Sequence, residues 1–280
     1  MDEGEQIRPK KSLGQHFLKD PYYLKKITEA ARINPDDQVL EIGPGLGHLT
    51  RELAAGAKRV IAIEFDKRLI PSLREEFSGT AKIEIVHADA LEYQYDALPG
   101  TWKVVANLPY YISSPIVRKL IQFRDKFTTL SLMLQKEVAE RIASPPGGKE
   151  YGFLSVLVQF YTEPRIEFMV PAGAFTPAPE VDSTVITLIV RKNSPLQVKN
   201  EGFLMRVVKA AFSQRRKTLR NALKQLDVSR ESMEKVFAAT GIDLGRRAET
   251  LSIDDFGALA DFLYAQHSEK PGESWLTNKT

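Results

Sequence analysis

An Asn-Leu-Pro-Tyr stretch at residues 107–110 ends one of the short apolar runs of the sequence. The Asn107 side-chain oxygen and the Leu108 carbonyl are acceptors, and two acceptors can hold both protons of an exocyclic amine. Pro109 donates no hydrogen bond and restricts the backbone of Leu108, which helps to aim that carbonyl outward. Tyr110 offers a ring face on which a base could stack. These residues predict a site that orients the amino group of a nucleobase.

A glycine-rich segment, EIGPGLGHLT, follows the first apolar run. Its alternating glycines permit a tight turn and close approach of a ligand to the backbone; they are Gly43, Gly45 and Gly47. His48 stands where a dinucleotide fingerprint has its third glycine, which disfavours a nicotinamide dehydrogenase. Glu64 ends the next run, where a carboxylate could accept both hydroxyls of a ribose, and Asp89 follows the third run, where it could accept from an adenine amine. The order of these residues predicts a pocket for an adenosine-bearing ligand.

The predicted pocket suggests a methyl transfer. The amino nitrogen of adenine is a poor nucleophile because its lone pair is delocalised into the ring, and two acceptors would favour a pyramidal nitrogen. If the bound ligand is S-adenosylmethionine, transfer is an in-line displacement that depends mainly on positioning. It requires no metal, and the histidines show no metal-ligand spacing. We expect Ser114 and Pro115 to start the next helix as N-cap and first residue, which would fix the turn.

The elements that must position these residues alternate along the chain between residues 38 and 191. Short apolar runs and helical patterns predict an α/β fold with a doubly wound parallel sheet. Two later runs, 165–170 and 184–191, have no helix between them and predict an antiparallel end to the sheet. The predicted parallel strands are 39–42, 59–63, 83–87, 103–106 and 130–135.

Length and composition limit the remaining possibilities. The 280 residues include no cysteine, the formal net charge is +3, and no apolar run is long enough to span a bilayer. We expect a cytoplasmic protein without disulfides. The polar stretch KNSPLQVKN predicts a domain boundary, after which the pattern is wholly helical. We predict a Rossmann-like domain at 1–192, a small all-α domain at 193–267 and a flexible tail at 268–280.

The motifs KKSLGQHFL, GPGLG, NLPY, FTPAPEVDS and FSQRRKTLRN resemble those of the KsgA-type small-subunit rRNA adenine dimethyltransferases. The resemblance extends from about residue 10 to residue 265, and the NLPY and FTPAPEVDS motifs are its most specific part. It implies a Rossmann-like, S-adenosylmethionine-dependent enzyme that dimethylates N6 of two adjacent adenosines in the 3′-terminal hairpin of 16S rRNA. The implied partner is an immature small ribosomal subunit, and we expect a monomer.

The resemblance also implies roles for single residues. The resemblance implies that Phe175 stacks the target base opposite Tyr110. Two positions depart from the family pattern: His16 replaces an asparagine, and Glu180 replaces a lysine, which removes a positive charge near the substrate. The predicted cofactor contacts are His16, Leu18, Gly43, Gly45, Glu64, Asp89 and Asn107, and the predicted catalytic residues are Asn107, Leu108, Tyr110 and Phe175.

Basic residues without acidic neighbours are concentrated between residues 202 and 226. Arg216, Arg220 and Lys224 are four residues apart, which predicts a shared helix face suited to phosphate contacts; the alternative is an ordinary solvated face. The residues Arg8, Lys10 and Lys11 suggest a second basic patch. The predicted RNA contacts are Pro109, Arg215, Arg216, Lys217 and Arg220.

Two other functions stay open at this point. A large-subunit rRNA adenine methyltransferase would have similar motifs, although RRKTLRN and the long helical C-terminal region favour the small subunit. A ribosome assembly factor that no longer methylates is the second alternative. The presence of Glu64, Asp89, Asn107 and Tyr110 argues against it.

Overall fold

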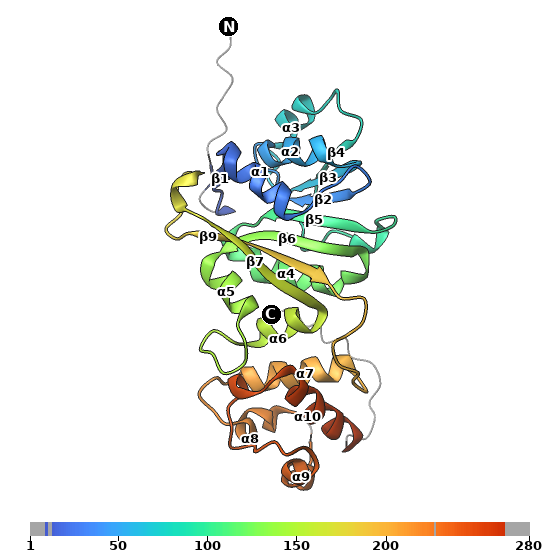
Figure 1. Cartoon of the computed structure of the whole chain (residues 1–280), viewed down its shortest axis with the longest axis vertical. Helices are drawn as coiled ribbons and strands as arrows, with labels where there is room; N and C mark the ends of the chain where they lie inside the picture. Colours follow the sequence, from blue (N-terminus) through green and yellow to red (C-terminus); the bar gives the residue numbers. More distant parts are fainter. Residues whose placement is uncertain (1–8, 11–12, 227, 267–280) are drawn as a thin grey trace. The chain divides into compact units, whose positions relative to one another are not determined.

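The computed structural model describes residues 9–10, 13–226 and 228–266 (Figure 1). These residues form two compact units. The first comprises the residues up to Ala139 together with Glu163–Val190, and the second comprises Glu140–Thr162 and the residues from Arg191 onward. The units divide close to the boundary predicted after residue 192, but Glu140–Thr162 groups with the second unit instead of the first. The functional division at 192 stays a prediction, and the predicted tail at 268–280 lies outside the described residues.

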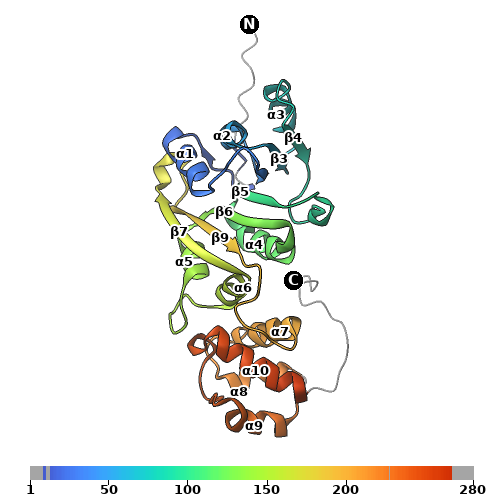
Figure 2. The same cartoon turned by 45° about the vertical axis from the view of Figure 1, so that its right-hand side comes forward.

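A seven-stranded sheet forms the centre of the first unit in the described part of the chain, with the strand order β4-β3-β2-β5-β6-β9-β7 (Figures 1 and 2). The strands β4, β3, β2, β5 and β6 are parallel, and β9 is antiparallel to β6. The α/β prediction is therefore confirmed, with the antiparallel strand second from the edge and β7 outside it. The bounds are Gln38–Ile42 for β2, Arg59–Glu64 for β3, Ile83–His87 for β4, Trp102–Asn107 for β5, Phe127–Gln135 for β6, Thr162–Val170 for β7 and Ser183–Val190 for β9.

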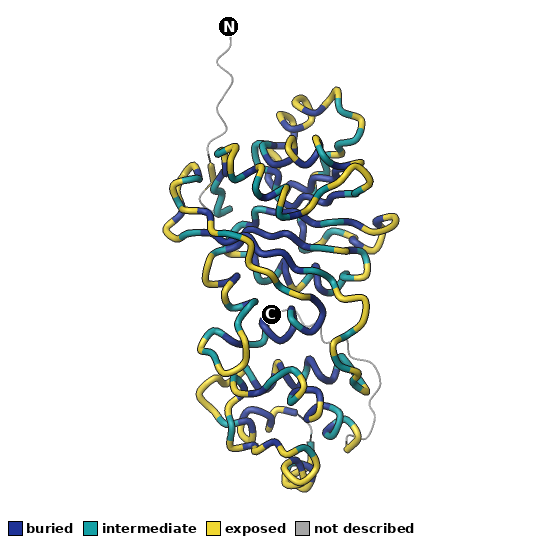
Figure 3. The backbone as a smooth tube through the Cα atoms, in the orientation of Figure 1, coloured by how far each residue is buried: buried dark blue, intermediate teal, exposed yellow. Residues whose placement is uncertain are grey.

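The central strands are buried because their side chains are apolar on both faces (Figure 3). Helix α2 packs against β3 and α1, and α3 packs against β4. Helix α1 has a side-chain cap at its start: Asp20 accepts from the Tyr22 N–H at 2.9 Å, Pro21 follows, and Leu24 and Ile27 are buried. The bounds are Pro21–Ala30 for α1, His48–Gly56 for α2, Ile70–Glu76 for α3, Ser113–Gln122 for α4 and Lys136–Ala143 for α5.

A small two-stranded sheet joins the N-terminal segment to the FTPAPEVDS motif. Strand β1 (Phe17–Leu18) runs antiparallel to β8 (Phe175–Thr176), with Leu18 opposite Phe175. Each strand has two residues, which is too short for an alternation pattern to predict. This pairing brings two motifs together that lie far apart in the sequence.

The described part of the second unit from Arg191 onward is helical, as its sequence pattern predicts. Helix α10 packs against α7 and α9. Buried apolar side chains such as Leu204, Val208 and Leu259 form the interior of this helical region. The bounds are Phe153–Tyr161 for α6, Glu201–Phe212 for α7, Leu219–Ala222 for α8, Arg230–Thr240 for α9 and Ile253–Gln266 for α10. None of the helices in the described residues combines the length and apolar character needed to cross a membrane.

The prediction of one basic helix face is wrong. Helix α7 ends at Phe212 and a turn follows, so that Arg216 lies outside any helix, whereas Arg220 lies in α8. The backbone explains the break: the Leu219 N–H donates to the Arg246 carbonyl at 2.9 Å, and the Arg220 N–H to the Leu244 carbonyl at 3.0 Å. These donors are used by another loop and cannot continue α7.

Candidate active site

A cavity of about 340 Å³ lies at the carboxyl ends of β2, β3, β4 and β5 in the first unit. This is where an open parallel sheet offers a ligand site, and the volume lies within the range of small-molecule pockets. The N-terminal segment 13–18 forms another wall. Ten of the predicted site residues line the cavity: His16, Leu18, Gly43, Gly45, Glu64, Asp89, Asn107, Leu108, Pro109 and Tyr110.

Phe175 is the one predicted catalytic residue that does not line this cavity. It is 4% exposed and packs in the apolar core with residues such as Leu24 and Val170. Pairing of β8 with β1 holds it there. In this arrangement Phe175 is buried and does not line the cavity. Its stacking role stays a prediction that would require β8 to move.

The glycine turn has the geometry that its sequence predicts. Gly45 and Gly47 have φ angles of 58° and 79°, in the left-handed region that favours glycine. A Cβ atom would lie 3.0 Å from the Phe17 ring at Gly45 and 3.0 Å from the Phe77 ring at Gly47. The turn is therefore closely packed against its neighbours. The backbone of Gly45 also makes a polar contact, because its N–H donates to Glu64 Oε2 at 3.1 Å.

Glu64 is held at the end of β3 by the backbone. Its Oε1 accepts from the Asp66 N–H at 2.7 Å, and its side chain is buried, with the residue 6% exposed. Burial raises the pKa of the Glu64 carboxyl, whereas the N–H donors of Asp66 and Gly45 lower it. Each oxygen of the carboxylate has acceptor capacity beyond one N–H. The two hydroxyls of a ribose could therefore bind here.

Asp89 has a local role as well as a place in the cavity wall. Its Oδ1 accepts from the Leu91 N–H at 2.8 Å and so forms a turn after β4. The other oxygen could accept from an adenine amine. Two aromatic residues that sequence analysis missed, Phe65 and Tyr111, also line the cavity and are 56% and 57% exposed. An aromatic residue directly after a strand-ending carboxylate is the signal that could have identified Phe65.

The NLPY segment is anchored on both sides of its predicted acceptors. The Asn107 amide nitrogen donates to the His16 carbonyl at 3.2 Å, which leaves the amide oxygen to accept from another group. The Leu108 N–H donates to the Met133 carbonyl at 3.2 Å. The Tyr110 hydroxyl bonds the Ser183 hydroxyl at 2.8 Å. The segment therefore has little freedom to move away from the cavity.

His16 contacts two other segments of this region, the NLPY segment and the FTPAPEVDS motif. Its ring stacks on Tyr110 with centroids 5.7 Å apart and planes at 25°, and its Nδ1 donates to the Pro177 carbonyl at 2.8 Å. A histidine at this position thus supplies a ring contact that the asparagine of the family motif cannot. It occupies one face of Tyr110, on which sequence analysis expects a base.

The start of the following helix differs from its prediction. Helix α4 begins at Ser113, directly after a 3₁₀ turn at Tyr110–Ile112, and no side chain caps it. The Ser113 hydroxyl donates to the Tyr110 carbonyl at 3.0 Å. Ser114 is therefore inside the helix and is not its N-cap, because the 3₁₀ turn continues without interruption into the α-helix.

Glu41 is a second carboxyl group at this site that sequence analysis overlooked. It lines the cavity from β2, is 1% exposed, and its Oε2 has no hydrogen-bond partner among the described residues. Burial raises its pKa to about 8, and the Glu64 carboxylate adds to this effect. The Thr50 hydroxyl, for which the described residues supply no hydrogen-bond partner either, offsets the shift only in part. The sequence signal that could have identified Glu41 is a single glutamate within the apolar run QVLEI.

Comparison with known proteins identifies the family. A family model described as ribosomal RNA adenine dimethylase matches residues 6–265. The chain is 47% identical over 266 residues to ribosomal RNA small subunit methyltransferase A of Moorella thermoacetica, which covers 91% of this chain and 92% of that protein. The chain belongs to the ribosomal RNA adenine dimethylase family. The predicted rRNA adenine methyltransferase activity and S-adenosylmethionine cofactor are thereby confirmed.

Solved structures agree with this assignment. A dimethyladenosine transferase from Plasmodium falciparum has a TM-score of 0.73 at 31% identity, over 87% of this chain and 96% of that one. The 23S rRNA methyltransferase ErmE has a TM-score of 0.70 at 29% identity, over 89% of this chain and 99% of that one. The fold is thus a Rossmann-like methyltransferase sheet with a helical C-terminal region.

The cavity fits S-adenosylmethionine on its own features. The buried Glu64 carboxylate is oriented by two backbone donors, and the glycine turn that lines the cavity packs so closely at Gly45 that a Cβ there would meet the Phe17 ring. Asp89 and the exposed rings of Phe65 and Tyr111 surround the remaining part. Carboxylates suit the ribose and adenine amine, and aromatic faces suit a base.

Proposed function

We propose that this protein dimethylates N6 of two adjacent adenosines in the 3′-terminal hairpin of 16S rRNA, within an immature small ribosomal subunit. The observation that carries the proposal is the position of Asn107–Tyr110 on the wall of a cavity that also holds Glu64 and Asp89. The similar protein of Moorella thermoacetica is named a small-subunit methyltransferase, which supports the choice of subunit. We keep the monomeric state and the cytoplasmic location as predictions.

The chemistry assigned to the NLPY segment is orientation of the target amine. The Asn107 oxygen and the Leu108 carbonyl would accept from its two protons, which favours a pyramidal nitrogen whose lone pair is directed into the cavity. S-adenosylmethionine supplies a sulfonium-bound methyl group as the electrophile. Tyr110, held by Ser183, would stack the base after it leaves the RNA helix. The proton released from the amine passes to solvent at the open side of the site.

We assign the phosphate contacts to the basic side chains of the second unit. Arg215, Arg216, Lys217 and Arg220 are all exposed there, although they do not share one helix face. Phosphate contacts depend on charge and reach more than on helical phase, so the loss of that phase does not weaken the proposal. Pro109 would contact the target nucleotide from the cavity wall.

The likeness to ErmE keeps a large-subunit substrate as the second candidate. In the test, the purified protein and labelled S-adenosylmethionine are incubated separately with two substrates. These are undermethylated small subunits and protein-free large-subunit rRNA. Label on two adjacent adenosines of the 16S hairpin is the expected result. Label on the large-subunit RNA alone would replace the proposed substrate, and label on neither would favour an assembly role.

The role of Asn107 has its own test. We expect Asn107→Ala to reduce kcat at least a hundredfold with RNA and cofactor affinity within a few-fold of wild type, since an oriented acceptor is lost. Glu84→Gln, a change of an exposed residue on β4, is the matched control. Near-normal turnover of Asn107→Ala would remove the assigned role.

A further inference from the structure

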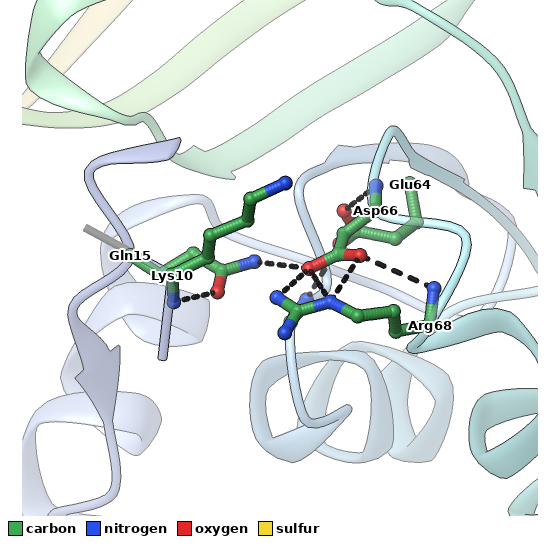
Figure 4. A network of polar contacts seen from close by, with 6 residues as sticks. Lys10, Gln15, Glu64, Asp66 and Arg68 are labelled. Carbon is green, nitrogen blue, oxygen red and sulfur yellow. Dashed lines mark hydrogen bonds and ion pairs between the residues drawn. The ribbon is translucent and has the colours of Figure 1, made fainter. Parts of the chain in front are cut away.

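A chain of hydrogen bonds ties the N-terminal segment to the end of β3 (Figure 4). The Lys10 N–H donates to Gln15 Oε1 at 2.7 Å, and Gln15 Nε2 donates to Asp66 Oδ2 at 2.9 Å. The segment 13–18 lines the cavity. The bond between Gln15 and Asp66 therefore fixes this part of the cavity wall to the loop directly after β3, next to the lining residues Glu64 and Phe65.

Asp66 makes a second connection through its backbone. Its N–H donates to Glu64 Oε1 at 2.7 Å, so the residue that holds Gln15 also orients the carboxylate assigned to the ribose. Asp66 is 6% exposed. A carboxylate is rarely buried to this extent unless it is paired, which indicates that its surroundings are built for it.

Arg68 supplies the pairing charge. Its Nε lies 2.9 Å from Asp66 Oδ1, and its Nη2 lies 2.5 Å from Asp66 Oδ2. Its own N–H also donates to Oδ1 at 3.1 Å. Hydrogen bonding to Arg68 lowers the pKa of the Asp66 carboxyl to about 2. The carboxylate that receives Gln15 is therefore charged and fixed in direction by a two-point contact.

We propose that Gln15, Asp66 and Arg68 form a latch that positions the N-terminal wall and Glu64 together for the cofactor. The proposal rests on the proposed role of Glu64 toward the ribose. The physical reason is preorganisation: without the latch, binding must also order the segment 13–18, and that entropy cost reduces affinity. The latch residues are positioning residues, because they act through Glu64 and the segment and not on the reacting atoms.

The latch makes a specific kinetic prediction. Loss of a hydrogen bond to a charged group should weaken cofactor binding about tenfold or somewhat more. Gln15→Ala should raise the Kd and KM for S-adenosylmethionine by this factor while kcat at saturating cofactor and KM for RNA stay at wild-type values. Asp66→Asn should do the same, and the double variant should lose less than the product of the two factors.

The experiment measures the Kd of S-adenosylmethionine and S-adenosylhomocysteine by calorimetry, with steady-state kinetics, on the full-length chain. Glu84→Gln is the control, because it breaks the 2.7 Å ion pair of Glu84 with Arg59 on β3 outside the cavity. Glu64→Gln reports separately on the ribose role. Gln15→Ala decides the outcome if Asp66→Asn fails to fold.

Wild-type Kd in Gln15→Ala together with weakened binding in Glu64→Gln would overturn the latch and leave the proposed function intact. Wild-type Kd in Glu64→Gln would instead remove the ribose assignment on which the latch depends. A fall in kcat without a change in Kd would also overturn the latch, since it would place Gln15 in the chemical step. Limited trypsin cleavage after Lys10 supplies a second measurement: the latch predicts that, without cofactor, wild type is cleaved more slowly than Gln15→Ala and that saturating cofactor reduces this difference.

Discussion

Replacement of Glu41 by glutamine tests whether β2 carries a protonated carboxylic acid at neutral pH. Glu41 is 1% exposed, and burial raises its pKa from 4.5 to about 8. Glutamine has nearly the same size and carries no charge at any pH, so it imitates the protonated acid. The substitution therefore removes a titration from the folded state with little change in packing.

The magnitude follows from the difference between the folded and unfolded pKa values. Between pH 4.5 and about pH 8 the folded state keeps the Glu41 proton and the unfolded chain has released it. The folded state then binds more protons, so the free energy of unfolding falls as pH rises. The folded and unfolded pKa values differ by about 3.5, and one pKa unit corresponds to about 1.4 kcal/mol. The free energy of unfolding should therefore fall by up to about 5 kcal/mol across this range. No further loss is expected above it.

The assay is urea unfolding of wild type and Glu41→Gln at pH 5, 6, 7 and 8. Fluorescence of Trp102, which is 1% exposed, reports on the first unit in a Trp275→Phe background. Relative to wild type, the variant should gain about 1.4 kcal/mol of stability for each pH unit up to pH 8. Burial also lowers the pKa of His48, which gives an opposite slope, but both proteins share it and the difference is unaffected.

Parallel pH profiles of wild type and Glu41→Gln would refute the reasoning, because they would mean that Glu41 is ionised in the folded protein. Glu84→Gln is the control for a carboxyl-to-amide change on an exposed position of the same sheet, and its profile should run parallel to wild type. A flattened profile in the control would show that the assay responds to net charge and not to the buried group.

Three further predictions concern other parts of the chain. Gly47→Ala should cost about 1–3 kcal/mol of unfolding free energy by urea titration, because φ is 79° and Phe77 lies 3.0 Å from the new Cβ; unchanged stability would contradict this packing. Asp66→Asn should lower the free energy of unfolding by about 1–2 kcal/mol at pH 7. This difference from wild type should vanish as pH falls from about 4 to about 2, because the folded pKa of Asp66 lies below the unfolded one. A difference that persists at about pH 2 would count against the Arg68 pairing. Arg215→Ala and Arg220→Ala should each reduce the salt dependence of binding to a 16S hairpin by about 0.9 in the slope of log K, measured by fluorescence anisotropy, and a wild-type slope would exclude phosphate contact.

Much of the first unit could be predicted from the sequence because its order follows from local patterns. Short apolar runs that alternate with helices allow few arrangements, and the carboxyl ends of parallel strands meet at one edge. Glu64, Asp89 and Asn107 each end or follow such a run, so their convergence required no knowledge of distant contacts. The turn at Gly45 is similar, since glycine alone suits its backbone at little cost.

The features that escaped prediction depend on contacts between distant segments. Gln15 and Asp66 are 51 residues apart, and neither belongs to a periodic pattern. The burial of Phe175 follows from a two-residue strand pair that no alternation signals. Arg216 lies in a turn because donors of the next helix bond to a loop about 25 residues later. In this last case tertiary hydrogen bonds override the local helical phase.

The site combines two kinds of support, and these predict two kinds of mutational effect. Glu64 is held by backbone N–H groups at a strand end, so substitutions around it should mainly alter cofactor affinity. Tyr110 is held by His16 and Ser183, side chains from segments far apart in the sequence. Because His16 also donates to the Pro177 carbonyl, small shifts between those segments would displace the stacking ring. Substitution of Ser183 should alter kcat at constant cofactor affinity, since orientation of the target base limits an in-line transfer.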